Sequence, residues 1–157
     1  MKFLTDGMLG KLTRWLRLLG YDVKYSRSLN DEQLIEIAKK ENRILLTRDL
    51  KLYRQAMTQK INSFFVEHIT EAKKLASLAR QFNLNLDFDV TVSRCPKCNA
   101  KINPIPKEKI IDKIPETTAS YYNEFWECSN CKKIYWQGAH WKRINKTLEE
   151  AKKALRT

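Results

Sequence analysis

Residues 43–49 read Arg43-Ile44-Leu45-Leu46-Thr47-Arg48-Asp49, a short apolar run that closes on polar residues and an acid. This composition predicts a strand over residues 43–46. The beginning of the chain has the same plan, because an expected strand over residues 2–5 ends at Asp6 and Gly7. Two early strands that each end in an aspartate are the starting point for both the fold and the function.

Strands and helices alternate four times in the first half of the chain. Strands are expected over residues 2–5, 22–25, 43–46 and 61–66. The helices are expected over residues 8–19, from the Asn30 cap with Gln33 in the capping-box position, over 50–60, and from the Thr70 cap to residue 82. This alternation predicts an α/β fold with a mostly parallel sheet and helices on both faces.

Three aspartates are expected at one edge of this sheet. The carboxyl ends of parallel strands share an edge, where ligands bind in such folds. Asp6 and Asp49 follow the first and third strands, and Asp31 lies in the first turn of the second helix. Crowded carboxylates repel one another unless a cation bridges them, and oxygen ligands of this kind suit Mg²⁺ or Mn²⁺. We therefore expect a catalytic metal site that acts on a phosphodiester.

Each aspartate also has a purely structural interpretation. Asp6 before Gly7 is a common turn residue, Asp31 favours the dipole of its helix, and Asp49 is a good cap for the third helix. Only the joint placement of the three at one edge favours the metal site.

The formal net charge of +12 attracts polyanions. The alternative is a lysine-rich surface that only keeps the protein soluble. Lys11, Arg14 and Arg17 recur every third residue on the first helix. They form either a solvated helix face or a row of cations that binds the phosphates of a substrate. Arg48 directly precedes Asp49. We expect these four cations to contact the substrate.

Four cysteines form two Cys-x-x-Cys pairs, Cys95 with Cys98 and Cys128 with Cys131. This spacing is typical of a structural zinc site in which four thiolates complete the coordination. Residues 83–93 interrupt the helical pattern and separate two parts, residues 1–93 and 94–157, and a terminal helix is expected over residues 146–156.

Aromatic and basic residues alternate around the second cysteine pair. Aromatic faces beside cations suit unpaired bases, although a small zinc module also needs rings for its core. We expect most rings to be core and the polar neighbours to contact RNA. These candidates are Lys132, Lys133, His140, Lys142 and Arg143.

The chain resembles the PIN-like ribonucleases, and most closely the Mut-seven C-terminal RNase domain family. The resemblance covers nearly the whole chain. It is carried by residues 3–12 (Phe-Leu-Thr-Asp-Gly-Met-Leu-Gly-Lys-Leu), 15–22, 31–34 and 43–49, by the cysteine pairs, and by residues 134–141 (Ile-Tyr-Trp-Gln-Gly-Ala-His-Trp).

The resemblance implies a PIN-like nuclease domain over residues 1–93 and a zinc-ribbon module with a C-terminal helix over residues 94–157. It implies RNA cleavage, with Asp6, Asp31 and Asp49 matching the acidic metal ligands of the family. PIN enzymes usually add a further acid from a helix between the first strand and the position of Asp31. The acid in that interval here is Asp22, and Glu32 and Glu67 are alternatives. The number of catalytic metals therefore stays open.

The function expected from the sequence is a metal-dependent ribonuclease whose zinc ribbon helps to bind RNA, with tRNA, rRNA or the ribosome as candidate partners. The alternative is a non-catalytic RNA-binding or ribosome-associated zinc protein. The chain has no apolar stretch long enough to span a membrane, and its first residues enter a strand rather than a signal peptide. We therefore expect a cytoplasmic protein without a membrane partner. The sequence leaves open the RNA target, the mode of cleavage, activity on DNA and the oligomeric state.

Overall fold

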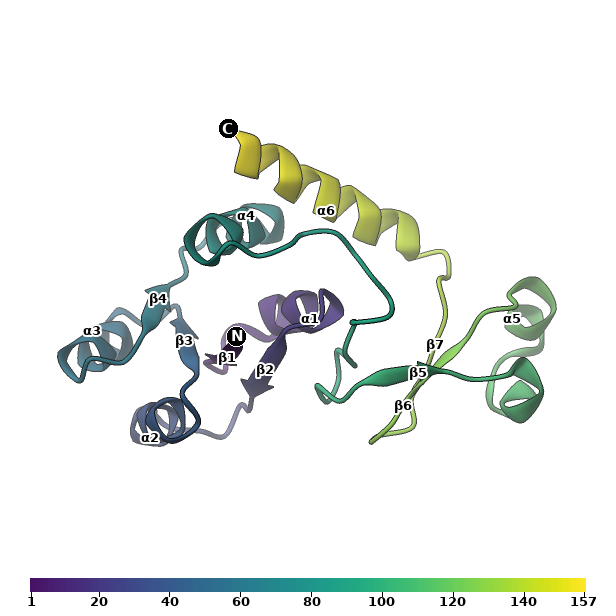
Figure 1. Ribbon diagram of the computed structural model, residues 1–157, viewed down its shortest axis with the longest axis horizontal. Coiled ribbons are helices and arrows are strands. Elements are labelled where there is room, and N and C mark those ends of the chain that lie inside the picture. The colour runs from purple at the N-terminus through teal and green to yellow at the C-terminus, as the bar shows by residue number, and fades with distance from the viewer.

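A computed structural model describes residues 1–157 and begins with a repeated strand–helix pattern (Figure 1). The strands of this part are β1 (Lys2–Thr5), β2 (Asp22–Tyr25), β3 (Ile44–Thr47) and β4 (Ser63–Phe65). The helices that follow them are α1 (Gly10–Leu18), α2 (Asp31–Glu41), α3 (Leu50–Thr58) and α4 (Glu71–Phe82). The predicted alternation is confirmed, and α3 ends two residues before the predicted limit.

The four strands form one sheet in the order β2-β1-β3-β4, and every neighbouring pair is parallel. The central strands β1 and β3 are paired with Leu4 opposite Leu45 and Thr5 opposite Leu46. Because these two strands are adjacent and parallel, the residues that follow them emerge at the same edge of the sheet.

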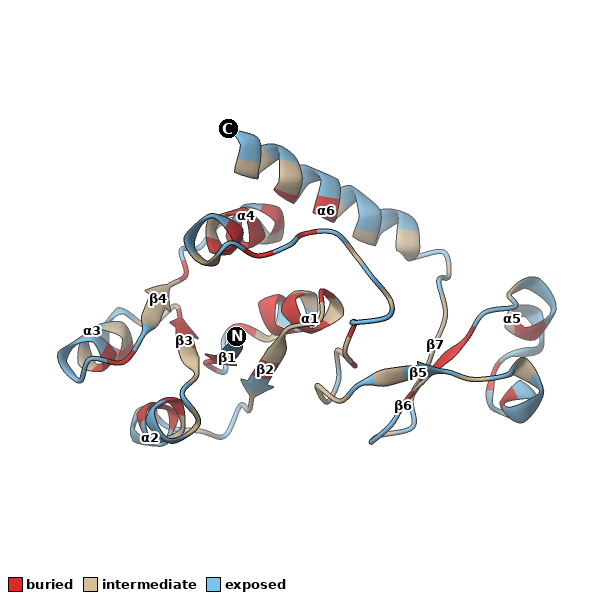
Figure 2. Ribbon diagram, in the orientation of Figure 1, coloured by how far each residue is buried: buried red, intermediate tan, exposed pale blue.

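Helices cover both faces of the sheet, as predicted. Helices α1 and α4 pack on one face through a large apolar cluster that includes Phe3, Leu12, Leu16 and Leu75. Helices α2 and α3 pack on the other face through a smaller cluster around Leu4 and Leu45. The buried residues accordingly lie on the sheet and on the inward sides of these helices (Figure 2).

Capping residues set the beginnings of two helices where the sequence placed them. Asn30 and Gln33 form a complete capping box, in which each side chain accepts from the backbone N–H of the other residue. Thr70 accepts a hydrogen bond from the Lys73 N–H at the start of α4. Both caps satisfy amide groups that the first turn of a helix leaves without partners.

The second part of the chain contains a three-stranded antiparallel sheet in the order β5-β6-β7. Its strands are β5 (Ile102–Pro104), β6 (Trp126–Cys128) and β7 (Ile134–Tyr135). Between β5 and β6 lie two 3-10 turns, η1 (Lys107–Lys109) and η2 (Ile111–Lys113), and the short helix α5 (Glu116–Tyr121). The insertion has its own small core, made by Ile110, Ile114, Ala119 and Phe125.

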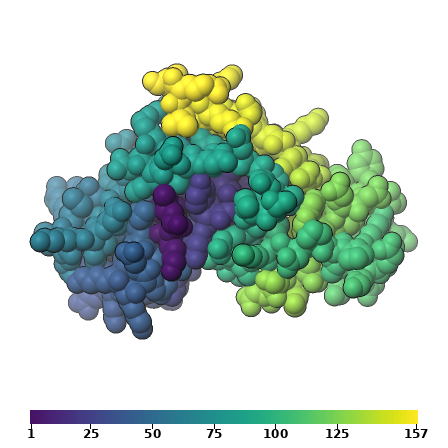
Figure 3. Space-filling view, viewed as in Figure 1, coloured from purple at the N-terminus to yellow at the C-terminus, as the bar shows by residue number.

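The last helix, α6 (Trp141–Arg156), begins five residues before the predicted Lys146. The earlier start has a tertiary cause, because the Trp141 ring packs edge-on against Phe88 with centroids 4.5 Å apart. Helix α6 then returns to the first part of the chain and packs on α4, where Leu148 and Ala151 join the main core. The space-filling view shows a larger and a smaller lobe with α6 lying across the top (Figure 3). No helix of the structure is sufficiently long and apolar to traverse a membrane.

Candidate functional site

Asp6 lies at the carboxyl end of β1 and is almost completely buried, with 6% of its surface exposed. Its Oδ1 accepts a hydrogen bond from the Met8 N–H at 2.8 Å. Its Oδ2 accepts from the Thr47 hydroxyl and from the Arg48 N–H. These bonds fix the carboxylate against the end of β3. They also show that the turn interpretation of Asp6 holds locally, since the bond to Met8 closes an Asx-turn.

Asp49 is held at the same point by Thr47. The Thr47 hydroxyl accepts from the Asp49 N–H at 2.9 Å while it donates to Asp6. The Asp49 Oδ1 caps α3 by accepting from the N–H groups of Lys51 and Leu52, and its Oδ2 makes no hydrogen bond within the chain. One buried hydroxyl therefore ties together the backbone of one predicted metal ligand and the carboxylate of another.

Asp31 is the first residue of α2, directly after the Asn30 cap. Its side chain is half-buried and makes no hydrogen bond. Because α2 follows β2, the neighbour of β1, Asp31 begins its helix at the sheet edge that carries Asp6. The loops after β1 and β2 contact each other, since the Tyr25 hydroxyl donates to the Gly7 carbonyl at 2.9 Å.

The three aspartates are less tightly grouped than the four cysteines. The cysteine sulfurs all lie within 4.8 Å of one another, whereas the aspartate oxygens do not meet that spacing. The structure thus links Asp6 and Asp49 through Thr47 and leaves Asp31 at the start of α2.

The cations predicted on α1 divide into two kinds. Lys11 and Arg14 are exposed, in keeping with a substrate contact or a solvated face. Arg17 is buried: its Nε and Nη2 donate to the Val23 carbonyl, and its Nη1 donates to the Pro96 carbonyl at 3.0 Å. Arg17 therefore joins α1 and β2 to the first cysteine loop.

A second contact between the two parts of the chain involves Asn99. Its side-chain oxygen accepts from the Val23 N–H at 3.0 Å, and its amide nitrogen donates to Asp22 Oδ1 at 2.7 Å. Arg43 donates to the same Asp22 oxygen at 2.9 Å. Sequence reasoning missed this interface. The only signal was a polar residue directly after Cys98, which also suits the left-handed backbone there (φ 77°).

We expect the Asp22 contact to make stability depend on pH. Burial opposes ionisation of Asp22, but hydrogen bonds from Arg43 and Asn99 outweigh it and hold the pKa below its ordinary value. A lowered pKa stabilises the fold above the unfolded-state pKa and loses that effect as pH falls through the folded-state value. Asp22→Asn should therefore cost on the order of 1 kcal/mol at neutral pH and progressively less in acid.

Urea unfolding of wild type and Asp22→Asn between neutral pH and the acid limb would measure this difference. Asp112→Asn, at an exposed position of η2 without hydrogen bonds, is the matched control. A difference between wild type and Asp22→Asn that stays constant over the whole pH range would contradict the assignment.

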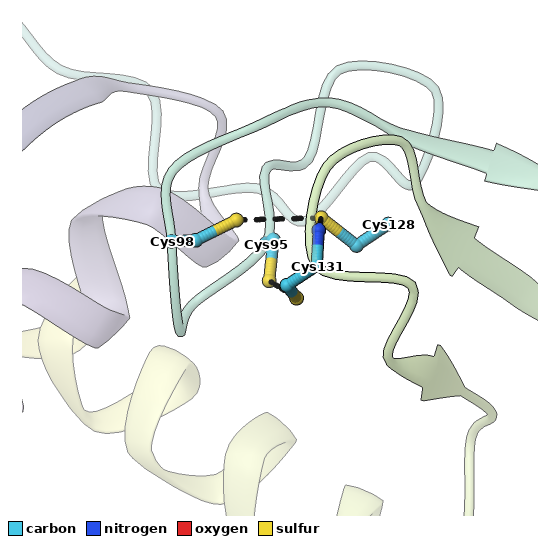
Figure 4. A group of neighbouring side chains, drawn as sticks. All are labelled: Cys95, Cys98, Cys128 and Cys131. Carbon is cyan, nitrogen blue, oxygen red and sulfur yellow. Dashed lines mark hydrogen bonds between the residues drawn. The ribbon is translucent and has the colours of Figure 1, made fainter.

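Cys95 and Cys98 come from one loop, Cys128 ends β6 and Cys131 lies in the turn after it, and the four sulfurs point toward one another (Figure 4). The Sγ atoms of Cys95 and Cys131 are 3.8 Å apart, and those of Cys98 and Cys128 are 3.4 Å apart. Four sulfurs about 2.3 Å from one tetrahedral zinc ion would be separated by roughly 3.8 Å, so the arrangement fits such an ion. The cluster could hold a metal, as predicted.

The surroundings of the cluster influence the thiols in different ways. Burial opposes ionisation of Cys98, but hydrogen bonds from the Ala100 backbone and from Cys128 and Asn130 lower its pKa to about 6. Burial raises the pKa of Cys128 to about 11. Metal binding would have to displace the Cys128 proton, because the thiolate is the ligand form.

Tyr135 was not among the predicted site residues, yet its hydroxyl lies 2.9 Å from the Cys95 sulfur. Burial, followed by the neighbouring thiols, raises the pKa of Tyr135. A neutral phenol at this place can donate to a thiolate.

Lys132 has a left-handed backbone (φ 66°) in the second cysteine loop, where glycine is the residue without steric cost.

The polar residues predicted to bind RNA in the second part are all exposed. They are Lys132, Lys133, His140, Lys142 and Arg143. The Lys133 ammonium lies over the Tyr135 ring, 5.5 Å from its centroid. Phe125 and Trp126 are buried, Tyr121 is 78% exposed, and the other rings of this part are only partly buried, so fewer rings than expected belong fully to a core.

One comparison with known proteins gave a match. The family model described as the Mut7-C RNAse domain matches residues 1–148. No curated protein and no solved structure matches the chain.

Proposed function

We propose, on the premise that the chain belongs to the Mut7-C RNAse domain family, that it is a metal-dependent ribonuclease with a PIN-like nuclease domain. The observation that carries the proposal is the family match together with two aspartates fixed at one sheet edge by a shared threonine. RNA is the substrate class that the family suggests. The excess of positive charge agrees with a polyanionic substrate.

Asp6, Asp49 and Asp31 would hold the catalytic Mg²⁺ or Mn²⁺. The Asp6 carboxylate accepts three hydrogen bonds, and a carboxylate offers about four lone-pair sites, so one remains for a cation. Asp49 Oδ2 and both oxygens of Asp31 accept no hydrogen bond and suit the same ion. When bound, the ion supplies a Lewis acid for the phosphoryl oxygen and lowers the pKa of the attacking water.

The remaining residues would position this acidic edge and its substrate. Thr47 holds the Asp6 carboxylate and the Asp49 backbone, and would thereby keep the two acids at the same strand end. Lys11, Arg14 and Arg48 would contact phosphates close to the edge. Lys132, Lys133, His140, Lys142 and Arg143 would contact RNA from the second part of the chain.

We further propose that the cysteines bind a structural zinc ion and that residues 94–157 act as a zinc ribbon with its terminal helix. A site filled by four thiolates has no open position for catalysis. Two Cys-x-x-Cys pairs without a disulfide also suit a reducing compartment, which supports the proposal that the protein is cytoplasmic.

One observation favours the alternative of a non-catalytic RNA-binding protein. Asp6 and Asp49 already have local structural roles, as a turn residue and a helix cap, that require no cation. Cleavage of RNA that requires a divalent metal ion would distinguish the ribonuclease from the non-catalytic RNA-binding protein.

The test is cleavage of a generic RNA by zinc-loaded protein that has been dialysed free of other divalent ions. We expect no cleavage without added metal and cleavage after addition of Mn²⁺ or Mg²⁺, with zinc content unchanged at one ion per chain. Absence of cleavage with every added metal, and no Mn²⁺ binding in calorimetry, would leave the non-catalytic alternative.

A further inference from the structure

A cleft of about 870 Å³ separates the two parts of the chain. One wall is α1, and the facing wall is formed by residues of the small antiparallel sheet and the loop after it. Residues of the linker and the first turn of α6 close the remaining side. Figure 1 shows these elements on either side of the junction. None of the three aspartates lines this cleft, so it is distinct from the acidic edge.

The lining is positively charged and contains no aspartate or glutamate, although the whole chain has 18 acidic residues. Seven cations line the cleft: Lys11, Arg14, Arg17, Arg27, Arg94, Lys97 and Lys133. Arg17 and Arg94 already donate to backbone carbonyls of the first cysteine loop. The other five are exposed and take part in no ion pair, so their charges are available to a polyanion.

Aromatic side chains form much of the remaining lining. They are Trp15, Tyr25, Phe88, Trp126, Tyr135, Trp136 and Trp141. Ring faces beside cations suit the stacking of unpaired bases, which depends little on sequence. The buried Ser93 also lines the cleft, and its hydroxyl has no partner within the protein.

One end of the cleft reaches the loop that follows Asp6. Gly10, Tyr25 and Arg27 belong to the lining. The Tyr25 hydroxyl donates to the Gly7 carbonyl, and a side chain at Gly7 would meet the Arg27 backbone at 3.4 Å. A strand lying in the cleft would therefore leave it beside the loop between Asp6 and α1.

We propose that this cleft binds a single-stranded segment of RNA and directs the adjoining phosphodiester to the acidic edge. The proposal rests on the proposed ribonuclease function and adds the strandedness of the substrate. The cleft of about 870 Å³ lies within the range of about 300–1,000 Å³ typical of pockets for drug-sized groups, which is room for a few bases of one strand. Bases stacked in a helix cannot reach the aromatic wall.

The test measures binding of fluorescein-labelled RNA to zinc-loaded wild type by fluorescence anisotropy, without Mg²⁺ or Mn²⁺, so that the strand stays intact. A single strand should bind at least about tenfold more tightly than a duplex of equal length. A strand of equal charge that lacks bases should also bind about tenfold more weakly, because stacking is lost. Equal binding of all three probes would overturn the proposal.

Two double variants locate the binding site. Lys11→Gln with Arg14→Gln removes two charges from the cleft and should lower the slope of log affinity against log salt by about 1.4 for a single strand. Lys40→Gln with Lys73→Gln removes two exposed charges from α2 and α4 and should leave the slope unchanged. If both double variants lowered the slope equally, the RNA would be attracted by the whole charged surface, and the proposal that the cleft is the binding site would be overturned.

The same measurements distinguish failure of the cleft from failure of the nuclease. Wild-type protein that binds single strands in the cleft but cuts no RNA with any metal would overturn the proposed function alone. Metal-dependent cleavage without any preference for single strands would overturn the cleft alone.

Discussion

Asp49→Asn should reduce metal-dependent RNA cleavage by about a hundred- to a thousandfold while leaving the fold intact. The carboxylate would lose its charge, and a lost metal ligand removes several kcal/mol of transition-state stabilisation, at about 1.4 kcal/mol for each factor of ten. The structural role of the residue would survive, because asparagine caps a helix as well as aspartate does. The amide oxygen of the substituted side chain could still accept from the N–H groups that Asp49 Oδ1 now serves.

The measurement is a single-turnover cleavage rate with Mn²⁺, accompanied by the free energy of unfolding in urea. Asp112→Asn makes the same change at an exposed position in the other lobe and should alter neither quantity. Unchanged cleavage by Asp49→Asn would reduce Asp49 to a helix cap and remove its proposed role as a metal ligand.

Asp6→Asn is a less clean substitution, and the structure explains why. Asp6 accepts bonds at both carboxylate oxygens, two of them at Oδ2 from Thr47 and Arg48. An amide nitrogen at either position would face a donor instead of accepting from it, at a cost of about 1–3 kcal/mol. Lost activity in that variant therefore mixes the loss of a ligand with the loss of a structural contact.

Local signals in the sequence were sufficient for most of the first part of the chain. Short runs of alternating or apolar residues predicted the four strands, and Asn30 with Gln33 predicted the start of α2, because both depend on residues close in sequence. Contacts between distant segments were not predictable. Arg17 has the same spacing on α1 as the exposed Lys11 and Arg14, and only the fold brings its guanidinium within hydrogen-bond distance of the Pro96 carbonyl. The early start of α6 likewise depends on Phe88, which is distant in the sequence.

At the acidic edge, too, the sequence predicts the positions set by the strands but not the contacts between side chains. An open α/β sheet implies that Asp6 and Asp49 share one edge, and the observed strand order brings them together because β1 and β3 are neighbours. The buried Thr47 hydroxyl that joins the two residues is a geometric detail of the strand end. Its position directly before Arg48 and Asp49 gave no indication that it would serve both aspartates.

Cys128→Ser should unfold the small antiparallel sheet without unfolding the large parallel one. Structural zinc sites contribute about 10–16 kcal/mol of apparent folding free energy in zinc-finger peptides, and a serine hydroxyl is a poor substitute for a thiolate ligand. The small lobe has few other sources of stability, because its own core has only four buried residues. The main cluster around the parallel sheet includes no residue of β5, β6 or β7, so its packing does not depend on the ion.

Hydrogen exchange measures this prediction strand by strand. Amides of β6 and β7 should lose protection in Cys128→Ser, and those of β1 and β3 should keep it, as should α6, whose Leu148 and Ala151 belong to the main core. Ser129→Ala changes the exposed neighbour of the ligand and should retain zinc and full protection. Single-strand RNA binding should fall with the small lobe, because one wall of the cleft unfolds. Retained protection of β6 in zinc-free Cys128→Ser would mean that the insertion and the Arg17 and Asn99 contacts hold the lobe together without a metal.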